Sequence, residues 1–310
     1  MKFSSRVTRT IWIVLTIVVA LIALRAYFRL TDDFRIANIS HEIPYHPEWE
    51  IPHLNSADQA EIDTILNQKF TYLGKGAQSY VFASEDQQYV IKFFKFKHLK
   101  PSWLAMMLPN VVPFSPYLER VSTRKQKKFN SIFAGYRLAY DLNRDESGLI
   151  YMQLNPTQQS RTVTVIDKIG LERNIDVGAV PFIIQYKGET FRTILAQLLD
   201  NGDLETAKQR IGQMLDLYQN EYRKGIYDRD HGVLHNTGFI GDKPLHLDVG
   251  KLSQDDRIKQ QANYEQDLAK VVARMLPWLE TNYPQSIHAL TQYIEHKLTQ
   301  DLGHRFAVAQ

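Results

Sequence analysis

The sequence predicts an α+β protein behind an apolar amino-terminal segment. Between residues 70 and 188, β-branched and aromatic residues gather in short runs that are typical of strands, with one amphipathic helix among them. From residue 189 onward, the apolar positions recur mainly at helical spacing. A sheet-rich first part followed by a helical second part predicts the α+β class.

Composition sets wide limits on function. The chain has 310 residues, of which 44% are hydrophobic and 23% are charged, as in ordinary globular proteins. Its net charge of +3 is too small to indicate nucleic-acid binding through bulk electrostatics. The absence of cysteine excludes a disulfide framework, a thiolate metal site and a cysteine nucleophile.

The first 30 residues are predicted to be a single-pass membrane anchor. Three basic residues precede an uncharged apolar run from Ile11 to Leu24, and apolar residues continue to Leu30 after Arg25. This length spans a bilayer if Arg25 extends to the interface. The alternative is a cleaved signal peptide, although no small-x-small cleavage site follows the apolar run.

Residues 31–56 are rich in proline and histidine and show no periodicity, which predicts a linker that leaves the membrane. Three of the ten histidines lie in it, at His41, His46 and His53. A solvated linker is favoured over a metal site formed by these side chains.

The remaining elements follow from periodicity and from turn residues. Helices are expected at residues 57–68, 122–141, 189–199 and 203–224, the last of them ended by Gly225. Strands are expected at residues 70–76, 79–84, 88–96, 148–154, 162–170 and 180–188, with short strands around Asn236 and Asp248. From about residue 255 the chain is expected to be helical, with breaks at Pro277 and Pro284.

A glycine-containing loop joins the first two predicted strands. Gly74 and Gly76 stand one residue apart, followed by Ser79 and Val81 on the second strand. Such a loop can lay backbone N–H groups over phosphates because glycine lets the backbone approach closely. The alternative is that the two glycines serve only the turn of a hairpin.

Lys92 lies eleven positions after Val81, within an apolar strand. A lysine buried on a strand needs an anion beside its ammonium group, and a phosphate under the glycine loop would be one. The alternative is an edge-strand lysine that points to water, since Lys95 and Lys97 follow closely.

Further along, carboxylates and an asparagine follow the long predicted helix. Asp228, Asp230 and Asn236 form one group, and Asp248 follows twelve residues after Asn236, just before a Val-Gly pair. An aspartate after an apolar strand suits a divalent cation bound to phosphate oxygens, and an asparagine oxygen can complete the metal shell. A separate carboxylate can position an accepting hydroxyl group.

In order and spacing these four motifs resemble the protein-kinase-like superfamily, over roughly Phe70 to Gly250. The glycine loop with its valine, the lysine strand, the Asp-Arg-Asp segment with its asparagine and the Leu-Asp-Val-Gly segment each resemble a kinase motif. The strand at 180–188 would lead to the adenine-contacting hinge. The resemblance implies a two-lobed fold, with a β-rich lobe at residues 57–188 and a helical lobe at residues 189–310.

The resemblance also implies ATP and Mg²⁺ as cofactors. The nucleotide-binding residues would be Gly74, Gly76, Ser79, Val81 and Lys92, the last of which is also implied in catalysis. The metal ligands would be Asn236 and Asp248. The catalytic aspartate would be Asp230 or Asp228, with Asp230 favoured.

The sequence departs from protein kinases in three respects. Asp230 precedes Asn236 by six residues instead of five, and Asp228 stands where a histidine is usual. Glu119 is the one acidic residue between Phe93 and Tyr140, so the partner glutamate of the lysine is in doubt. No activation segment follows Gly250. In this respect the sequence is more like bacterial relatives that phosphorylate small molecules, sugars or lipopolysaccharide.

The favoured hypothesis is therefore a membrane-anchored phosphotransferase whose acceptor is a lipid-linked sugar, a small molecule or a protein. A pseudokinase scaffold and a membrane-tethered structural domain are the alternatives. An apolar insert and a basic cluster at residues 101–128 suggest contact with anionic lipid, although packing on the first lobe is favoured. The basic flanks weakly favour a cytoplasmic amino terminus, which would place the domain where ATP is scarce. The membrane face and the oligomeric state stay open.

Overall fold

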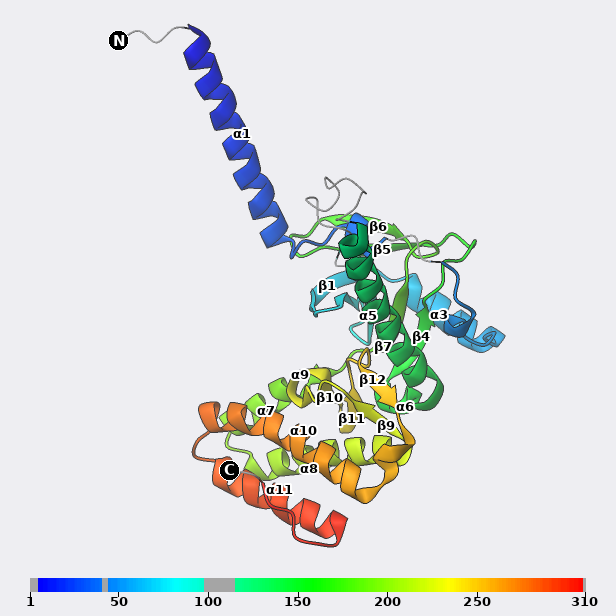
Figure 1. Ribbon diagram of the computed structural model, residues 1–310, viewed down its shortest axis with the longest axis vertical. Coiled ribbons are helices and arrows are strands. Elements are labelled where there is room, and N and C mark those ends of the chain that lie inside the picture. The colour runs from blue at the N-terminus through cyan, green and yellow to red at the C-terminus, as the bar shows by residue number, and fades with distance from the viewer. Residues whose placement is uncertain (1–4, 41–43, 98–114, 309–310) are drawn as a thin grey trace. The chain divides into compact units, whose positions relative to one another are not determined.

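The computed structural model describes residues 5–40, 44–97 and 115–308, and it has the predicted α+β class (Figure 1). The chain forms two compact units. Unit 1 comprises residues 1–45, 52–98 and 155–182, and unit 2 comprises residues 46–51, 99–154 and 183–310. Residues 101–114, the apolar part of the predicted lipid-contacting insert, lie outside the described residues.

Unit 1 is built on a sheet whose strands run in the order β3-β2-β1-β5-β6. The strands are β1 (Phe70–Lys75), β2 (Ser79–Ser84), β3 (Tyr89–Phe94), β5 (Thr162–Ile166) and β6 (Glu172–Asp176). Strands β1, β2 and β3 pair antiparallel, whereas β5 runs parallel to β1. The side chains that form its core include Phe70, Phe82, Ile91, Phe93 and Val165, all fully buried.

The strand β6 was not expected from the sequence, which predicted one strand over residues 162–170. The chain instead turns back at Asp167–Leu171, and β6 pairs antiparallel with β5. Because β6 carries Glu172, Arg173 and Asp176 and exposes most of its side chains, it lacks the apolar alternation that marks a strand in sequence.

The described residues of unit 1 form three helices: α1 (Ser5–Leu30), α2 (Ile36–Ile39) and α3 (Ser56–Leu66). The predicted helix near residues 57–68 is confirmed as α3, whose Asn55 cap accepts a hydrogen bond from the Asp58 N–H at 2.8 Å. The helix α1 includes Thr8–Leu30, a stretch long and apolar enough to cross a bilayer, a test that a signal sequence also passes.

Parts of residues 31–56, the predicted linker, are packed rather than solvated. Phe34 and Ile39 are buried in unit 1, and Trp49, in the short helix η1 (Pro47–Trp49), is buried in unit 2. The Trp49 ring packs edge-on against Phe133 at 4.8 Å between centroids. Scattered aromatic residues form these contacts, so the apolar residues show no helical or strand spacing from which the packing could be predicted.

Unit 2 contains the long helix α5 (Ser115–Leu142), which confirms the predicted helix at 122–141, and the short helix α6 (Arg144–Ser147). It also contains β4 (Leu149–Gln153) and most of β7 (Phe182–Tyr186). Two small sheets follow. The first has the order β11-β10-β8, from Lys243–His246, Thr237–Ile240 and Glu189–Thr190, and the second pairs β9 (Ile226–Asp228) with β12 (Leu252–Gln254).

The core of unit 2 lies among four helices: α7 (Phe191–Asp200), α8 (Leu204–Arg223), α10 (Gln261–Asn282) and α11 (Ile287–Leu302). The predicted helix at 203–224 is confirmed, with Asp203 as its cap and Gly225 in the left-handed region at φ 81° after it. The short helix η2 (Asp256–Lys259) precedes α10.

The expected break at Pro277 is wrong, because α10 continues through it to Asn282. The side chains of Met275, Leu276 and Leu279 around the proline are buried in the core. Their burial offsets the loss of one helical hydrogen bond. Pro284 does lie between α10 and α11, as expected.

Candidate functional site

The glycine loop is the β1–β2 hairpin of unit 1. The register between the two strands shifts between Tyr72 and Gly74, so the hairpin contains a bulge. The Gly76 N–H donates to the Ser79 carbonyl at 3.0 Å and closes the turn. Lys95, the residue after β3, stabilises the turn, because its ammonium donates to the Gly76 carbonyl and lies 4.5 Å from the centre of the Tyr80 ring.

The backbone conformation of the hairpin does not by itself require glycine at position 74 or 76. Each has an ordinary negative or extended φ, whereas six glycines elsewhere lie in the left-handed region. A Cβ atom at Gly74 would meet no atom within 4 Å, and one at Gly76 would meet only the Ser79 hydroxyl at 4.0 Å. The open space beside both glycines leaves room for a ligand to approach the backbone.

Lys92 lies on β3 directly opposite Val81 of β2. It is only 9% exposed, so it does not extend into water as an edge-strand lysine would. Its neighbours in sequence behave differently, because Lys97 forms an ion pair with Asp33 and Lys95 binds the hairpin. Burial and the charge of Lys75 lower the pKa of Lys95 to about 8.

In unit 2, β9 and the turn after it bring Asp228, Asp230 and Asn236 together. Asp228 accepts a hydrogen bond from the Asp230 N–H at 2.8 Å, which folds the turn back onto the strand. The Asn236 side-chain amide donates to both carboxylates, at 3.4 Å in each case. The three residues named by the sequence motif therefore form one cluster.

Asp228 is held by a buried ionic group that the sequence analysis missed. Glu221 of α8, His246 of β11 and Asp228 are all completely buried. The Nδ1 atom of His246 lies 3.1 Å and 3.3 Å from the two Glu221 oxygens, and its Nε2 lies 3.5 Å from Asp228 Oδ2, an ion-pair distance. Asn143 donates to Glu221 at 2.7 Å and completes the group.

This arrangement fixes the charges of Asp228 and His246. Burial by itself raises the pKa of Asp228, but contact with His246, together with hydrogen bonds from Asp230 and Asn236, lowers it to about 2. Burial by itself lowers the pKa of His246, but the charge of Glu221 and contacts with both carboxylates raise it to about 10. Asp228 is therefore a fixed anion paired with an imidazolium, which suits it to support the turn rather than to exchange protons.

Asp248 lies beside Asn236 because β10 and β11 form a hairpin. The Asn236 carbonyl accepts hydrogen bonds from the Leu247 and Asp248 N–H groups, at 2.6 Å and 2.9 Å. The Asp248 carboxylate accepts from the Gly250 N–H at 3.2 Å. These contacts hold both predicted metal ligands on adjoining strand ends.

Helix α5 presses closely on the segment that follows Asp248. A Cβ atom at Gly135 would lie 2.6 Å from the Val249 carbonyl oxygen, so only glycine fits there. Tyr136 is completely buried next to it, and burial together with the charge of Asp248 raises the pKa of its phenol well above the usual value. The position of Asp248 is thus set by backbone packing.

Asp230 is the accessible carboxylate of the cluster. Its side chain is 42% exposed, whereas that of Asp228 is fully buried. Its Oδ2 atom forms an ion pair with Lys251 at 2.6 Å. The sequence analysis did not single out Lys251, although its place just after the Asp-Val-Gly segment is a usable signal.

The residue after Asp230 connects the turn to the helical core. His231 has a left-handed φ of 51°, and its Nε2 atom lies 2.7 Å from Asp267 Oδ1 on α10. Asp267 is buried and also accepts a hydrogen bond from the Tyr222 hydroxyl at 2.9 Å. Because a left-handed histidine is strained, these contacts offset the strain and define the turn.

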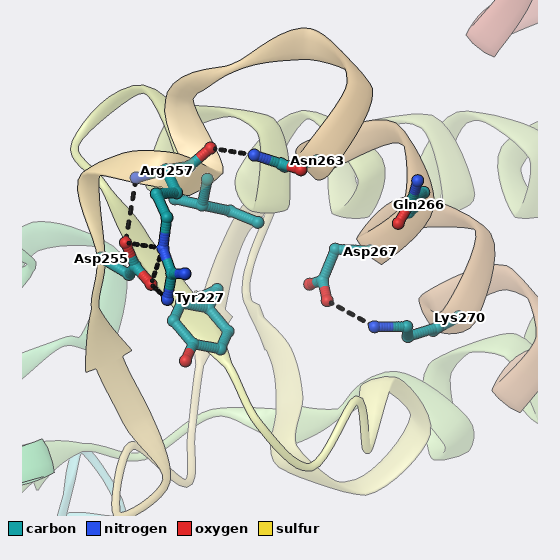
Figure 2. Close-up of a pocket in the computed structure, with 8 residues that line it drawn as sticks. Tyr227, Asp255, Arg257, Asn263, Gln266, Asp267 and Lys270 are labelled. Atoms are coloured by element: carbon teal, nitrogen blue, oxygen red, sulfur yellow. Dashed lines mark hydrogen bonds and ion pairs between the residues drawn. The ribbon is translucent and has the colours of Figure 1, made fainter.

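A pocket of about 260 Å³ lies beside this turn in unit 2 (Figure 2). Tyr227, which precedes Asp228, lines it together with Asp267 and Lys270, whose side chains form an ion pair at 3.7 Å. Figure 2 shows the Asp255–Arg257 ion pair on the other side of the opening. The pocket offers carboxylates, cations, amides and an aromatic ring.

Magnesium is compatible with the residues present. Among the residues that the structure describes, no group of three or more His, Cys, Asp or Glu side chains is arranged to hold a metal. Mg²⁺ does not need such a cage, since it commonly binds one or two carboxylates together with waters and substrate phosphates. Asp248 with the amide oxygen of Asn236 meets that requirement.

Comparison with known proteins gives no family by sequence. No family model and no curated protein matches the chain. A structure of the bifunctional kinase-methyltransferase WbdD is 12% identical over 74% of this chain, with a TM-score of 0.34, and this chain covers only 46% of the WbdD chain.

Two further solved structures are similar at the same level. The Rv3197–erythromycin complex from Mycobacterium tuberculosis is 14% identical, with 86% of this chain and 73% of that chain covered and a TM-score of 0.33. The streptomycin–ATP–APH(2″)-IIa ternary complex is 12% identical, with 81% and 97% covered and a TM-score of 0.27. Because all three scores are low, the case for a kinase-like protein depends on the residues of the chain itself.

Proposed function

We propose that the chain is a membrane-anchored, ATP-dependent phosphotransferase of the protein-kinase-like superfamily. The observation that carries this proposal is the cluster in unit 2, where Asp228, Asp230, Asn236 and Asp248 meet at the ends of short strands. One carboxylate is buried and held as an anion, one is accessible, and a third lies beside an amide. The accessible carboxylate can orient an acceptor hydroxyl group, and the carboxylate beside the amide can bind a metal ion, as phosphoryl transfer requires.

Each residue has a task in the proposal. Asp248 and Asn236 hold Mg²⁺, and bound ATP supplies the phosphoryl group. The Lys92 ammonium neutralises phosphate charge, and the backbone at Gly74 and Gly76 lies over the phosphates, with Ser79 and Val81 completing the nucleotide site.

Asp230 orients the acceptor hydroxyl group and receives its proton. Its ion pair with Lys251 must open or rearrange for this step. Asp228 does not touch the acceptor in this proposal, since it is completely buried and paired with His246. The predicted choice of Asp230 over Asp228 therefore gains support from burial.

The acceptor is proposed to be a small, hydroxyl-bearing molecule or a sugar on a lipid. Between Asp248 and the start of α10 at Gln261, the described chain forms only β12 and η2, so no long segment is available there to hold a peptide. The pocket beside Tyr227 and Asp267 offers both donors and acceptors of hydrogen bonds, which suits hydroxyl groups. The helix α1 would hold the enzyme at the membrane.

A pseudokinase scaffold is the second candidate. The observation in its favour is the 2.6 Å ion pair of Lys251 with Asp230, which occupies the carboxylate that an active enzyme would need as its base. Asn236 follows Asp230 by six positions instead of the five usual in kinases, which points the same way.

The experiment that separates the two candidates measures ADP formation by the full-length chain in lipid nanodiscs, with ATP, Mg²⁺ and a panel of sugar and lipid acceptors. The matched variants are Asp230→Asn, Lys251→Ala and, as a control on an exposed ion pair, Asp242→Asn. The enzyme proposal predicts turnover that Asp230→Asn lowers by about a hundredfold or more and that Asp242→Asn leaves unchanged. ATP binding without turnover in any variant would instead identify a scaffold.

A further inference from the structure

The carboxyl-terminal end of α1 is joined rigidly to unit 1. The helix closes with hydrogen bonds from the Thr31 N–H to the Tyr27 carbonyl at 2.9 Å and from the Asp33 N–H to the Phe28 carbonyl at 2.7 Å. Asp32 and Asp33 both lie in the left-handed region, at φ 53° and 63°. Two consecutive strained aspartates persist only where their surroundings hold them.

Ion pairs with lysine side chains stabilise this strained backbone. Asp32 forms ion pairs with Lys75 at 2.8 Å and Lys168 at 3.0 Å and accepts a hydrogen bond from the Tyr72 hydroxyl at 2.9 Å. Burial by itself raises the pKa of Asp32, but hydrogen bonds from the two lysines and the tyrosine lower it to about 2. The end of α1 is thereby tied both to β1 and to the turn between β5 and β6.

Asp33 forms the second half of the joint, with Arg35 at 2.8 Å and with Lys97. We call Arg35, Lys75, Lys97 and Lys168 the cationic collar. Each collar side chain is between 39% and 55% exposed, and four positive charges face two negative ones. The joint therefore carries excess positive charge that is accessible to solvent.

The β5–β6 turn lies against the last turn of α1. Arg173 of β6 donates to the Tyr27 hydroxyl at 2.7 Å while it forms an ion pair with Asp167 at 3.2 Å. Tyr27 is three residues before the end of α1, which is about 4.5 Å along the helix axis. Tyrosine and arginine at the end of a candidate span are typical of the membrane–water interface.

The tip of this turn exposes two large apolar side chains. Ile169 is 42% exposed and Leu171 is 46% exposed. The Asp167 carboxylate accepts hydrogen bonds from both of their N–H groups, at 3.1 Å and 2.9 Å, and Gly170 between them has a φ of 85°. The turn is thus well defined, and nearly half of each apolar side chain at its tip is exposed to solvent.

We propose that the β5–β6 tip and the cationic collar form a second membrane contact, on the anionic bilayer that α1 enters. Ile169 and Leu171 insert at the boundary between headgroups and acyl chains, and the collar cations pair with lipid phosphates. Leu171 is two residues from Arg173, about 7 Å along a strand, so the tip reaches the interface that Tyr27 marks. The proposal goes beyond phosphotransfer and depends on the proposed anchor.

The absence of native cysteine makes a direct test possible. Single cysteines would be placed in the full-length chain at Ile169→Cys and Leu171→Cys, labelled with an environment-sensitive nitrobenzoxadiazole dye and reconstituted into phosphatidylcholine vesicles with or without phosphatidylserine. Ile17→Cys, in the middle of α1, reports on the anchor, and Gln88→Cys, on the exposed β2–β3 turn of the same unit, reports on solvent.

The proposal predicts a blue-shifted emission at both tip positions that headgroup-level nitroxide lipids quench and that phosphatidylserine strengthens. Replacing Lys75 and Lys97 together by glutamine should remove the phosphatidylserine dependence. A lipid-like signal at position 17 with tip signals like that of position 88 would overturn the second contact and leave the anchor intact. A solvent-like signal at position 17 would overturn the anchor and this proposal with it, without bearing on phosphotransfer.

Discussion

Replacing His246 by glutamine should destabilise unit 2 and change how its stability depends on pH. His246 lies between two carboxylates, Glu221 and Asp228, and all three side chains are completely buried. Glutamine keeps a similar size and a hydrogen-bonding amide but carries no charge. The two acids would then repel each other in a medium with little screening.

The magnitude follows from two separate arguments. Breaking a buried ion pair by removing one partner typically costs about 3–5 kcal/mol. A rise in the pKa of His246 from 6.5 to about 10 corresponds to about 5 kcal/mol at 1.36 kcal/mol for each unit. The two arguments agree on about 4–5 kcal/mol, which lowers the melting temperature of a unit of this size by roughly 8–20 °C.

The pH dependence gives a sharper signature than the melting temperature. Because folding raises the pKa of His246, its contribution is fully present below pH 6.5 and is lost as the pH rises towards about 10. Over this window the folded unit holds one proton more than the unfolded chain, so stability falls by about 1.4 kcal/mol for each pH unit. Urea unfolding between pH 7 and pH 9.5, followed by tryptophan fluorescence, measures this slope.

The control is His235→Gln, at an exposed position of the neighbouring short helix α9 (Val233–Asn236). This control should keep the wild-type slope and stability, whereas His246→Gln should lose the slope. A His246→Gln variant that retains both would refute the assignment of a buried imidazolium between Glu221 and Asp228.

Three further predictions concern other parts of the fold and the site. Gly135→Ala should destabilise unit 2 by about 1–3 kcal/mol in urea unfolding, because the new methyl group would lie 2.6 Å from the Val249 carbonyl; a stabilised variant would show that α5 can move away. Gly76→Val should leave the free energy of unfolding within about 1 kcal/mol of wild type, since open space surrounds this residue. The same variant should weaken ATP binding measured by calorimetry, and an unchanged affinity would speak against a phosphate under the loop. His231→Ala should lower ADP formation more than it alters the dissociation constant for ATP, since it removes the 2.7 Å contact with Asp267 that defines the turn; equal losses in both would point to general unfolding.

Local signals explain why much of the fold could be predicted from the sequence. The helix at 203–224 has a capping aspartate, an apolar stripe and a terminal glycine, and the structure places α8 at Leu204–Arg223. Runs of β-branched and aromatic residues likewise predict the strands that carry the glycine loop and Lys92. Where the sequence pattern and the physical requirement are local, prediction succeeds.

Features that depend on distant residues were not predicted. The partners of His246 lie at Glu221 and Asp228, 25 and 18 residues away in the sequence, and no spacing rule connects them. The motif analysis noted an aspartate where kinases usually have a histidine, but not that β11 supplies a histidine beside it. A histidine within the apolar Leu-His-Leu-Asp stretch was a usable signal, since a buried histidine needs a partner.

Two departures from expectation have a common cause. Pro277 was expected to break α10, and the whole of residues 31–56 was expected to be solvated, because both expectations came from local propensity. In each case burial of neighbouring apolar side chains, such as Leu279 around the proline and Phe34 and Trp49 in the packed segment, outweighs the propensity.

The most direct test of the central claim is nucleotide binding by the full-length chain in nanodiscs. Thermal unfolding would be followed with and without ATP plus Mg²⁺, for wild type, Lys92→Ala and Asp248→Ala. The matched controls are Lys69→Ala and Asp242→Ala, which remove exposed residues of the same types.

At a ligand concentration a hundred times the dissociation constant, binding should add about 2.7 kcal/mol of stability. The account predicts that wild type and both controls gain this stabilisation only when Mg²⁺ is present, and that Lys92→Ala and Asp248→Ala lose it. No stabilisation of wild type at millimolar ATP, or a full gain in the Asp248→Ala variant, would contradict the assignment of a kinase-like nucleotide site.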